Sequence, residues 1–544
     1  MRAEELDALL GDPWDTANPV GHAAVIHADE RLEMLAEGER LLDRLNVHAE
    51  SVPAHLGGRL ERADHLAAVH RTLWRRDPSL AVGHAFGSFA GSAAVWAAGT
   101  QDQRRQTADL LLAGGRIATA LREPDEDSAA AGTARRETGR WRLDGRHELV
   151  ANLAGADAAV LTAGTTESPG RRRFLVSRAD LRATGVRDLP RRGSTGLRGV
   201  VLGGVELRDC AVPADTLIGD DARPDGTARA TQLVLAVLAS CTVGPLDTAL
   251  RCALGFAAGR RLYGATAADI PYVRAVIARA YADLLAADAL AAVTLRAVHL
   301  SPAAAVYAPA ARYLTSRLAL DACEDLRSVL GAQGYLREGT YAIFQKMTRD
   351  LAAAAVIQLP GTACLPAVLP HLARPAGLHA PQDPPADPRL FRLGGDLPPL
   401  DLHRAVPAQP GGDPVIGAIA GREPDGGPVG RFVARFRDEL RSLREQSAAV
   451  PPRYRVTLAH RYTVLLAAAS ALAVWEHGGD RPGEPELLGV LDRLAGRLDG
   501  GAVLTDAERE RTEEHLFAAA AERHRGGAPL DLTARPTPGP GGDR

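Results

Sequence analysis

Apolar residues recur every three or four positions from the start of the chain to about residue 112. This period predicts several amphipathic helices, with interruptions at Pro53 and at Gly57 and Gly58. At Gly114 and Gly115 the pattern changes to short runs in which apolar and polar residues alternate, as they do in strands. These runs cover 116–121, 141–143, 148–153, 158–163, 173–176 and 205–212. The pattern therefore predicts a helical region followed by a compact β region.

The helical period returns beyond Ala228 and continues to Leu372. Two long helices are expected over 245–261 and 270–300, because their prolines fall only in the first turn, where a helix tolerates them. Prolines and glycines then crowd 376–414, where missing amide donors and fixed φ angles predict a linker or a meandering wrap. Four further helical patterns follow, over 430–446, 458–475, 484–498 and 506–524.

These changes in pattern divide the chain into six segments. We expect an N-terminal helical domain, a middle β domain, a helical bundle, a Pro/Gly-rich linker, an appended C-terminal helical domain and a flexible tail. Their predicted bounds are 1–113, 114–225, 226–375, 376–424, 425–528 and 529–544. The chain has 544 residues, which is long enough for several domains, since a domain averages about 150 residues.

Composition narrows the class of protein. Lys and Arg total 64 against 67 for Asp and Glu, a net charge of -3, so the chain lacks the basic footprint of a nucleic-acid-binding protein. Five widely spaced cysteines without a C-x-x-C pair argue against disulfides and structural zinc, and no metal site is predicted. The N-terminus has no apolar signal segment, so we expect a cytoplasmic protein. The longest apolar runs, 233–239 and 463–475, are shorter than the roughly 20 residues of a membrane span and predict buried helices.

Four charged residues and one thiol are given structural interpretations. Lys346, the lone lysine, lies about two helical turns from Glu338, and the two are predicted on a solvated helix face. Arg349 and Asp350 are predicted to form a structural pair. Cys364 follows an apolar stretch and is predicted to be a packed, unreactive thiol.

Short strings at the junctions between these regions form an ordered series. About a dozen occur in sequence between residues 30 and 372. They include Ala120-Leu121-Arg122-Glu123-Pro124, Val150-Ala151-Asn152, Gly196-Leu197-Arg198-Gly199, Arg260-Arg261-Leu262-Tyr263-Gly264, Gly331-Ala332-Gln333-Gly334-Tyr335, Arg349-Asp350 and Gly361-Thr362. Each string is weak alone, but together and in this order they resemble the acyl-CoA dehydrogenase superfamily. The resemblance implies an α+β, mostly α fold: an N-terminal helical domain, a middle β-barrel-like domain and a C-terminal four-helix bundle, here with an appended helical unit. It also implies a homodimer or a dimer of dimers.

The resemblance implies an oxidoreductase that acts on an acyl thioester bound to CoA or to an acyl carrier protein. In such flavoenzymes FAD accepts hydride from the β-carbon while a carboxylate removes the α-proton. Arg260 would pair with the FAD diphosphate, because a guanidinium can bind it in a bidentate fashion. The other residues carried over to the cofactor are Gly331, Gly334, Leu121, Ala151, Gly361 and Thr362.

The sequence departs from the family at the flavin ring and at the base. Arg122 stands where the family has Thr, and Ala151 removes a hydroxyl that usually meets the ring. The usual glutamate immediately before Gly361 is Pro360, which cannot remove a proton, and the segment Gln232 to Leu235 supplies no alternative carboxylate. Glu123 is the remaining candidate base. Three alternatives stay open: a descendant that has lost FAD and performs cyclisation, elimination or binding, a flavin monooxygenase, and a silent partner subunit.

Overall fold

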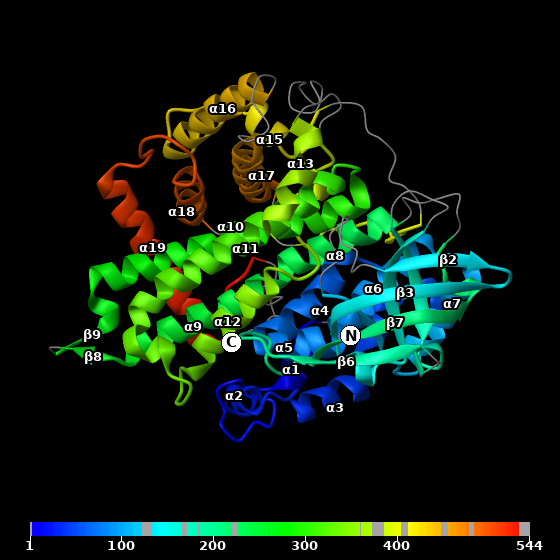
Figure 1. The fold of residues 1–544 in the computed structure, drawn as a ribbon. Helices are drawn as coiled ribbons and strands as arrows, with labels where there is room; N and C mark the ends of the chain where they lie inside the picture. The colour runs from blue at the N-terminus through cyan, green and yellow to red at the C-terminus, as the bar shows by residue number, and fades with distance from the viewer. Residues whose placement is uncertain are drawn as a thin grey trace, which may run out of the picture. The chain divides into compact units, whose positions relative to one another are not determined.

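A computed structural model describes most of the chain, and contacts divide it into two compact units (Figure 1). The described residues are 3–121, 132–165, 171–182, 185–219, 227–262, 264–359, 361–372, 386–403, 412–447, 455–477 and 483–532. The first unit comprises Met1–Val237, Ala352–Pro360 and Pro399–Ala405. The second comprises Leu238–Leu351, Gly361–Pro398 and Val406–Arg544.

The first unit begins with short helices, as the apolar period predicts. They are α1 (Ala3–Leu10), α2 (His22–Glu30), α3 (Ala36–Arg44), α4 (Ala63–Arg76), α5 (Pro78–Leu80), α6 (Gly87–Ala98) and α7 (Gln101–Leu112). In α4, Leu66, Val69 and Leu73 are buried, which is the stripe of an amphipathic helix. The helix α7 begins at a capping box in which the Thr100 hydroxyl and the Gln103 side chain each accept a hydrogen bond from the other residue's backbone.

Three turns connect these helices: η1 (Val47–Ser51), η2 (Ala54–Leu56) and the π-helical turn η3 (Ala81–Phe86). Because η3 directly continues α5 into α6, the three form one nearly continuous helix. The Trp96 indole on α6 donates to the backbone oxygen of Ser51 over 2.8 Å, and the Ser88 hydroxyl accepts from Ile117 N over 3.1 Å. These bonds tie α6 to η1 and to the sheet.

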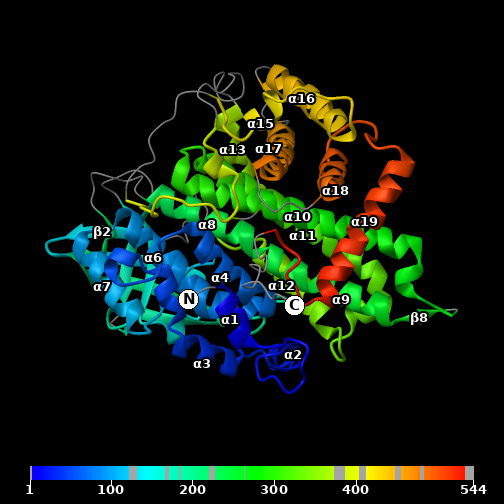
Figure 2. The ribbon, with the colours of Figure 1, turned by 180° about the vertical axis from the view of Figure 1, so that it is seen from behind.

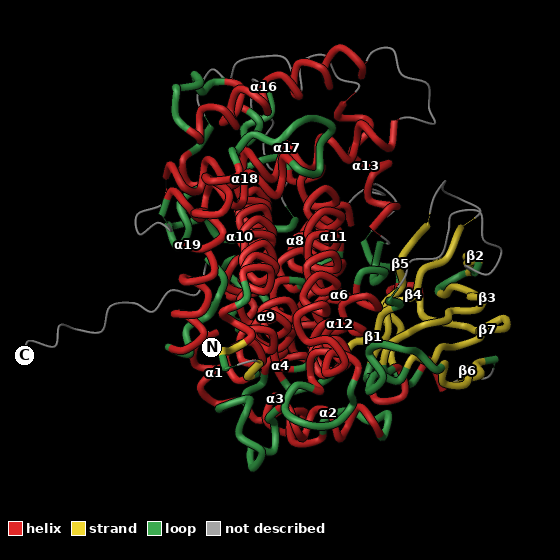
Figure 3. Tube along the Cα trace, turned by 90° about the vertical axis from the view of Figure 1, so that its left-hand side faces the viewer, coloured by secondary structure: helices red, strands yellow, loops and turns green. Residues whose placement is uncertain are grey.

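The β part of the first unit is a curled mixed sheet (Figure 3). Its strands are β1 (Ile117–Thr119), β2 (Thr133–Glu137), β3 (Arg140–Ala151), β4 (Ala158–Thr165), β5 (Arg171–Ser177), β6 (Val186–Arg192) and β7 (Leu202–Pro213). The order is β1-β4-β2-β3-β7-β6, with β5 paired to β4. The pairs β1–β4 and β2–β4 are parallel and the others antiparallel. Alternate residues such as Trp141, Leu143, Phe174, Val176 and Val205 form the core of this sheet.

The sequence predicted six strand runs, and the structure both merges and extends them. The runs 141–143 and 148–153 are parts of one strand, β3, which carries register shifts at Leu143/Gly145 and Glu148/Val150. These irregularities break the alternation and made one strand look like two. The strands β2 and β6 were missed, because their side chains are mostly charged and exposed.

The second unit is built on long helices. They are α9 (Val243–Gly259), α10 (Pro271–Leu300), α11 (Ala304–Leu330) and α12 (Ala342–Ala354), and α8 (Ala228–Cys241) leads from the first unit into them. The predictions for 245–261 and 270–300 are confirmed to within two residues. The helices α10 and α11 run side by side and are rich in buried alanine and leucine, as expected for helices apolar on every face.

Further helices belong to the same compact unit (Figure 2). These are α13 (Cys364–Leu372), α15 (Gly417–Ala420), α16 (Pro428–Ser447), α17 (Arg455–His477), α18 (Glu484–Ala495) and α19 (Asp506–Arg525), and short strands β8 (Arg261–Leu262) and β9 (Ala265–Thr266) follow α9. The four helical patterns predicted after residue 430 coincide with α16 to α19. Because α17, α18 and α19 all contact α10, the appended helices share a core with the bundle.

Among the described residues, three helical runs are long and apolar enough to cross a membrane by length and composition: Pro78–Ala98, Ala228–Gly259 and Arg455–His477. The runs 233–239 and 463–475, judged too short from the sequence, lie inside the last two. Within the structure, 83%, 100% and 78% of the three apolar windows are buried by protein. Packing inside the protein accounts for their composition.

One structural interpretation from the sequence was wrong. Lys346 is 1% exposed, and its ammonium bonds the buried Asp350 carboxylate one turn further along α12, so it does not lie on a solvated face. Asp350 therefore pairs with Lys346, and the Arg349 Nε bonds Gln345 over 2.8 Å. The two residues share a helix, and spacing alone did not show which partner each faces.

The start of the predicted tail is docked. Leu530 and Leu532 are buried, and their backbone N–H groups donate to Asp247 over 3.1 Å and to Asp288 over 2.6 Å. The prediction of a flexible segment was therefore wrong for 529–532, while 533–544 lie outside the described residues. The buried carboxylates that receive these bonds lie on α9 and α10, far away in sequence.

Candidate functional site

Residues predicted to lie along a flavin ring meet in the first unit. Ala120 bridges to Val150, and Leu121 N donates to Leu149 O over 3.0 Å. Gln358, from the segment before the predicted base position, donates its backbone N–H to Leu121 O and its side-chain amide to Ala120 O over 3.0 Å. The chain leading to Pro360 is thus fastened to the edge of β1. Pro360 itself, Glu123 and Arg122 lie outside the described residues.

Ala151 and Asn152 end strand β3 at the same corner. Ala151 pairs with Leu202 and is buried. Asn152 has φ +50°, a left-handed conformation that Asn tolerates better than most residues. Its side chain accepts from Val201 N over 2.8 Å and donates to Gly83 O over 2.7 Å. The close approach requires glycine at 83, because a Cβ there would lie 2.7 Å from the Asn152 amide nitrogen.

An Asn152→Ala substitution should therefore destabilise the first unit by about 2–3 kcal/mol, since it removes two hydrogen bonds and places alanine at positive φ. Chemical unfolding measures the loss. An Asn152→Gly variant is the matched comparison, because it removes the same bonds without the strain, and it should recover part of the loss. Equal stability of all three proteins would contradict this role.

Arg260 caps the C-terminal end of α9 in the second unit. Its backbone is fixed, because its N–H donates to Phe256 O over 2.8 Å and its carbonyl accepts from Ala267 N over 2.7 Å. Its side chain is exposed, and among the described residues no hydrogen bond or ion pair engages the guanidinium. An unpaired guanidinium is suited to an anionic group such as a diphosphate.

The glycine turn that follows α11, η10 (Gly331–Tyr335), has two different glycines. Gly331 has φ +55°, and a Cβ there would meet nothing within 4 Å, so its backbone is open to a ligand. Gly334 is buried, and a Cβ there would lie 3.3–3.5 Å from Arg327, Leu330 and Phe344. Packing inside the unit accounts for Gly334, whereas Gly331 remains a candidate contact for a cofactor.

Gly361 and Thr362 form a short turn, η11 (Gly361–Ala363), before α13. Thr362 is exposed and Gly361 is half-buried. Next to them, burial raises the pKa of the Cys364 thiol to about 12, so this cysteine is a packed group, as predicted, and not a nucleophile. All five cysteines are free and buried.

The predicted site residues thus form two groups, each within its own unit. Leu121 and Ala151 belong to the first unit. Arg260, Gly331, Gly334, Gly361 and Thr362 belong to the second. Gln358 is a residue whose structural role was not predicted. Its bonds to Ala120 and Leu121 join positions more than 230 residues apart, and a local sequence pattern carries no signal for such a contact.

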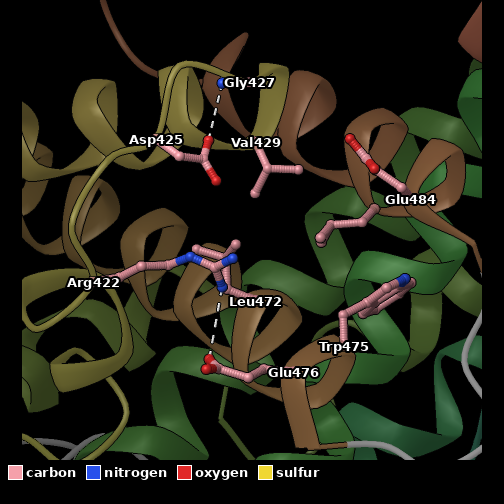
Figure 4. A pocket seen from close by; sticks show the side chains of 9 residues that line it. Arg422, Asp425, Gly427, Val429, Leu472, Trp475, Glu476 and Glu484 are labelled. Carbon is pink, nitrogen blue, oxygen red and sulfur yellow. Dashed lines mark hydrogen bonds and ion pairs between the residues drawn. The ribbon is translucent and has the colours of Figure 1, made fainter.

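A pocket of about 490 Å³ lies among the appended helices (Figure 4). Its walls combine apolar side chains of Val429, Leu472, Trp475 and Leu487 with Arg422 and the acidic Asp425, Glu476 and Glu484. Arg422 lies 3.7 Å from the Glu476 carboxylate. Three carboxylates against one arginine repel a phosphate-bearing molecule, so this pocket does not suit FAD or CoA. None of the residues predicted for the cofactor lines it.

Comparison with known proteins gives a family match for a stretch that lies mostly in the second unit. The sequence model for the C-terminal domain of acyl-CoA dehydrogenases matches residues 235–362. The human mitochondrial short-chain specific acyl-CoA dehydrogenase is 27% identical over 252 residues, which cover 44% of this chain and 60% of that protein. The chain therefore matches a little over half the length of this relative.

Solved structures extend the likeness to the whole fold. An acyl-CoA dehydrogenase from Bacillus anthracis, complexed with FAD, superposes with a TM-score of 0.67 at 16% identity, covering 96% of this chain and 92% of that one. Butyryl-CoA dehydrogenase from Megasphaera elsdenii gives a TM-score of 0.60 at 18% identity over 69% of this chain and 99% of that one. The predicted fold is confirmed, and the first of these structures also spans the appended helices.

Proposed function

This chain belongs to the acyl-CoA dehydrogenase superfamily, and on that premise we propose that it is an FAD-dependent oxidoreductase acting on an acyl thioester of CoA or of an acyl carrier protein. The observation that carries the proposal is Arg260, whose exposed guanidinium has no partner among the described residues. It lies inside the stretch that the family model matches. A guanidinium without a protein partner can bind a diphosphate in a bidentate fashion.

The residues present fit FAD better at its diphosphate than at its ring. Arg260 would bind the diphosphate, and the open backbone at Gly331 would approach the cofactor closely. At the ring, Leu121 already uses its N–H and carbonyl within the protein, and Ala151 offers only a methyl group. When bound, FAD supplies a hydride acceptor for the β-carbon of the thioester. The chain's part is to hold and orient it.

Proton removal needs a carboxylate that the usual position lacks. Pro360 cannot accept a proton, and Glu123 is the acidic residue that the sequence places nearest the Ala120–Leu121 edge. We include Glu123 in the proposal as the base that would take the α-proton. A general base contributes about 10²- to 10⁴-fold to such a step, so its position decides whether dehydrogenation proceeds.

Loss of the Arg260 side chain tests the cofactor site. In an Arg260→Ala variant, FAD should bind roughly ten- to a hundredfold more weakly, because a charge-assisted hydrogen bond contributes about 1.5–3 kcal/mol. Titration of the apoprotein with FAD, followed by flavin fluorescence, measures the change. Arg261→Ala, at the exposed neighbouring position, is the control and should bind as the wild type does. Equal weakening in both variants would show a general loss of positive charge instead.

The reaction class has its own readout. Anaerobic mixing with a panel of acyl thioesters should bleach the flavin absorbance of a dehydrogenase. Oxygen consumption by the reduced protein, without bleaching by any thioester, would favour a flavin monooxygenase instead. Either result separates the chemistry from the question of cofactor binding.

One alternative is favoured by a specific observation. The occupied backbone of Leu121 and the methyl group of Ala151 reduce the hydrogen bonds available to a flavin ring, which favours a descendant that has lost FAD. Such a protein would use its cleft for a non-redox reaction or for binding a thioester. A colourless preparation that binds no added FAD would establish this alternative.

The proposal includes a homodimer in the cytoplasm. The exposed apolar side chains of Tyr335 and Leu336, at 66% and 46%, support a covered surface beside the glycine turn. The five free, buried cysteines support a reducing compartment. Sedimentation of the purified protein would give its assembly state directly.

A further inference from the structure

Three potential metal ligands meet in the first unit, and none of them is among the residues carried over from the family. Asp43 lies at the end of α3, His48 in η1 and His84 in the π-helical turn η3. One donor atom of each lies within 4.8 Å of the other two. The His84 Nε2 is 2.8 Å from Asp43 Oδ1, and the rings of His48 and His84 are stacked, with centroids 4.8 Å apart and planes inclined by 5°.

Three of the four imidazole nitrogens of this cluster have no hydrogen-bond partner among the described residues. His48 is 2% exposed, and neither its Nδ1 nor its Nε2 has a hydrogen-bond partner among the described residues. The Nδ1 of His84 is also buried and unbonded there. Buried polar atoms in native proteins almost always have a partner, and an exception often marks a site for an ion or water. The unpaired ring nitrogens of His48 therefore indicate a place where a ligand could bind.

Burial favours the uncharged form of both imidazoles. It lowers the pKa of His48 to about 3, and it lowers the pKa of His84 although the hydrogen bond with Asp43 acts in the opposite direction. A neutral imidazole keeps a lone pair available for coordination. Burial alone would raise the pKa of Asp43, but hydrogen bonds from His84 and Arg116 outweigh it and keep this carboxyl ionised.

We propose that Asp43, His48 and His84 bind one divalent transition-metal ion, with Zn²⁺ as the representative case. Two imidazole nitrogens and one carboxylate oxygen suit Zn²⁺ and its first-row neighbours, whereas Mg²⁺ and Ca²⁺ prefer oxygen ligands throughout. Three protein ligands leave a fourth position open to water or to a small ligand. The cluster contains no cysteine, so the cysteine spacing that argued against structural zinc has no bearing on it.

The ligands need a small rearrangement to close around an ion. At Zn–ligand distances of about 2.0–2.1 Å, tetrahedral donors lie about 3.3 Å apart, so the stacked rings must tilt toward each other. His48 can tilt without breaking any hydrogen bond, because it makes none with the described residues. His84 would exchange its bond to Asp43 for the metal. The wider π-helical turn that carries His84 is a geometry common at functional sites.

The positive charge of Arg116 repels a metal ion and therefore limits the affinity of this site for metals. Its guanidinium bonds both Asp43 oxygens, at 3.0 and 3.1 Å, and Glu39 over 3.0 Å. Asp43 and Glu39 together carry two negative charges against the one positive charge of Arg116, so the site keeps a net negative charge. Arg116 would remain as an outer partner that orients the carboxylate. We therefore expect a Kd for Zn²⁺ in the micromolar range, which is weaker than that of the tightest zinc sites.

Direct titration of the full-length wild-type protein tests the site. After removal of metals with a chelator, Zn²⁺ should bind at one equivalent by calorimetry and raise the melting temperature, and Co²⁺ should give the absorption bands of a tetrahedral site. Mg²⁺ should do neither. Absence of one-equivalent Zn²⁺ binding at submillimolar concentration would overturn the proposal. No step of the test depends on FAD or on activity, so its outcome is independent of the proposed function.

Variants locate the ion. Asp43→Asn and His48→Ala should each weaken Zn²⁺ binding at least about tenfold. His65→Ala, which removes an exposed histidine of the same unit, is the control and should leave binding unchanged. Asp43 has a partly exposed side chain, so its variant keeps the comparison valid if loss of His48 prevents folding. Binding by both cluster variants as tight as that of the control would refute this location.

Discussion

An Asp413→Ala variant is expected to unfold with a free energy about 3–5 kcal/mol lower than that of the wild type. Asp413 is buried in the second unit, where its carboxylate joins the end of the Pro/Gly-rich stretch to three helices. It accepts hydrogen bonds from the hydroxyls of Tyr307 on α11 and Tyr462 on α17, and it pairs with His371 on α13 over 3.1 Å. Alanine would leave two buried tyrosine hydroxyls and the partly buried His371 imidazole without this partner.

The same carboxylate should make stability depend on pH. Burial alone would raise the pKa of Asp413, but the hydrogen bonds from His371, Tyr307 and Tyr462 and the charge of His371 hold it below its ordinary value near 3.8. A lowered pKa in the folded state adds stability above the unfolded-state value, and this stability is lost as the pH falls through the folded value. Wild-type stability should therefore fall below about pH 4 more steeply than that of Asp413→Asn.

Urea unfolding at pH 7 and along an acid series measures both effects. Asp396→Ala is the matched control, because Asp396 is an exposed aspartate in the same unit and should change stability by less than about 0.5 kcal/mol. A loss below about 1 kcal/mol for Asp413→Ala would mean that the carboxylate does not hold these helices together.

The second large effect concerns chemistry and rests on the proposed function. A Pro360→Glu substitution should speed the reduction of bound flavin by an acyl thioester by about 10²- to 10⁴-fold, because it places a carboxylate at the position where the family has its base. Stopped-flow absorbance under anaerobic conditions measures the rate.

Pro360→Gln is the control, since it has nearly the same shape as glutamate and cannot take a proton at neutral pH. Both variants also lose the proline ring, so only the difference between them reports the base. Equal rates for the two would indicate that this position does not face the α-carbon, and would direct the search for the base to Glu123.

Much of the fold could be predicted because its helices show an apolar period in the local sequence. The apolar period of 270–300 and of the four stretches after residue 430 gave helices within a few residues of the observed bounds. The strand β6 gave no such signal, because charged residues fill its exposed positions. Spacing also failed for Lys346, since a helical pattern shows which residues share a face but not whether that face meets solvent or protein.

The residues of the candidate sites also differ in whether a local sequence pattern reveals them. Arg260 and Gly331 were found through ordered strings, and the structure gives each an open environment suited to a cofactor. Asp43, His48 and His84 have no ligand spacing that a sequence search would notice, because they meet only when the end of α3 and the turns η1 and η3 fold together. Asp413 lies in a region without apolar periodicity, so no local sequence pattern predicted that its carboxylate accepts hydrogen bonds from several helices.

The burial of Lys346 bears on how this protein responds to reagents that attack amines. With its one lysine side chain sealed against Asp350, the folded chain presents no side-chain amine for acylation or for crosslinking. Unfolding releases a single such group. The extent of acylation at Lys346 would then measure the fraction of molecules that have unfolded.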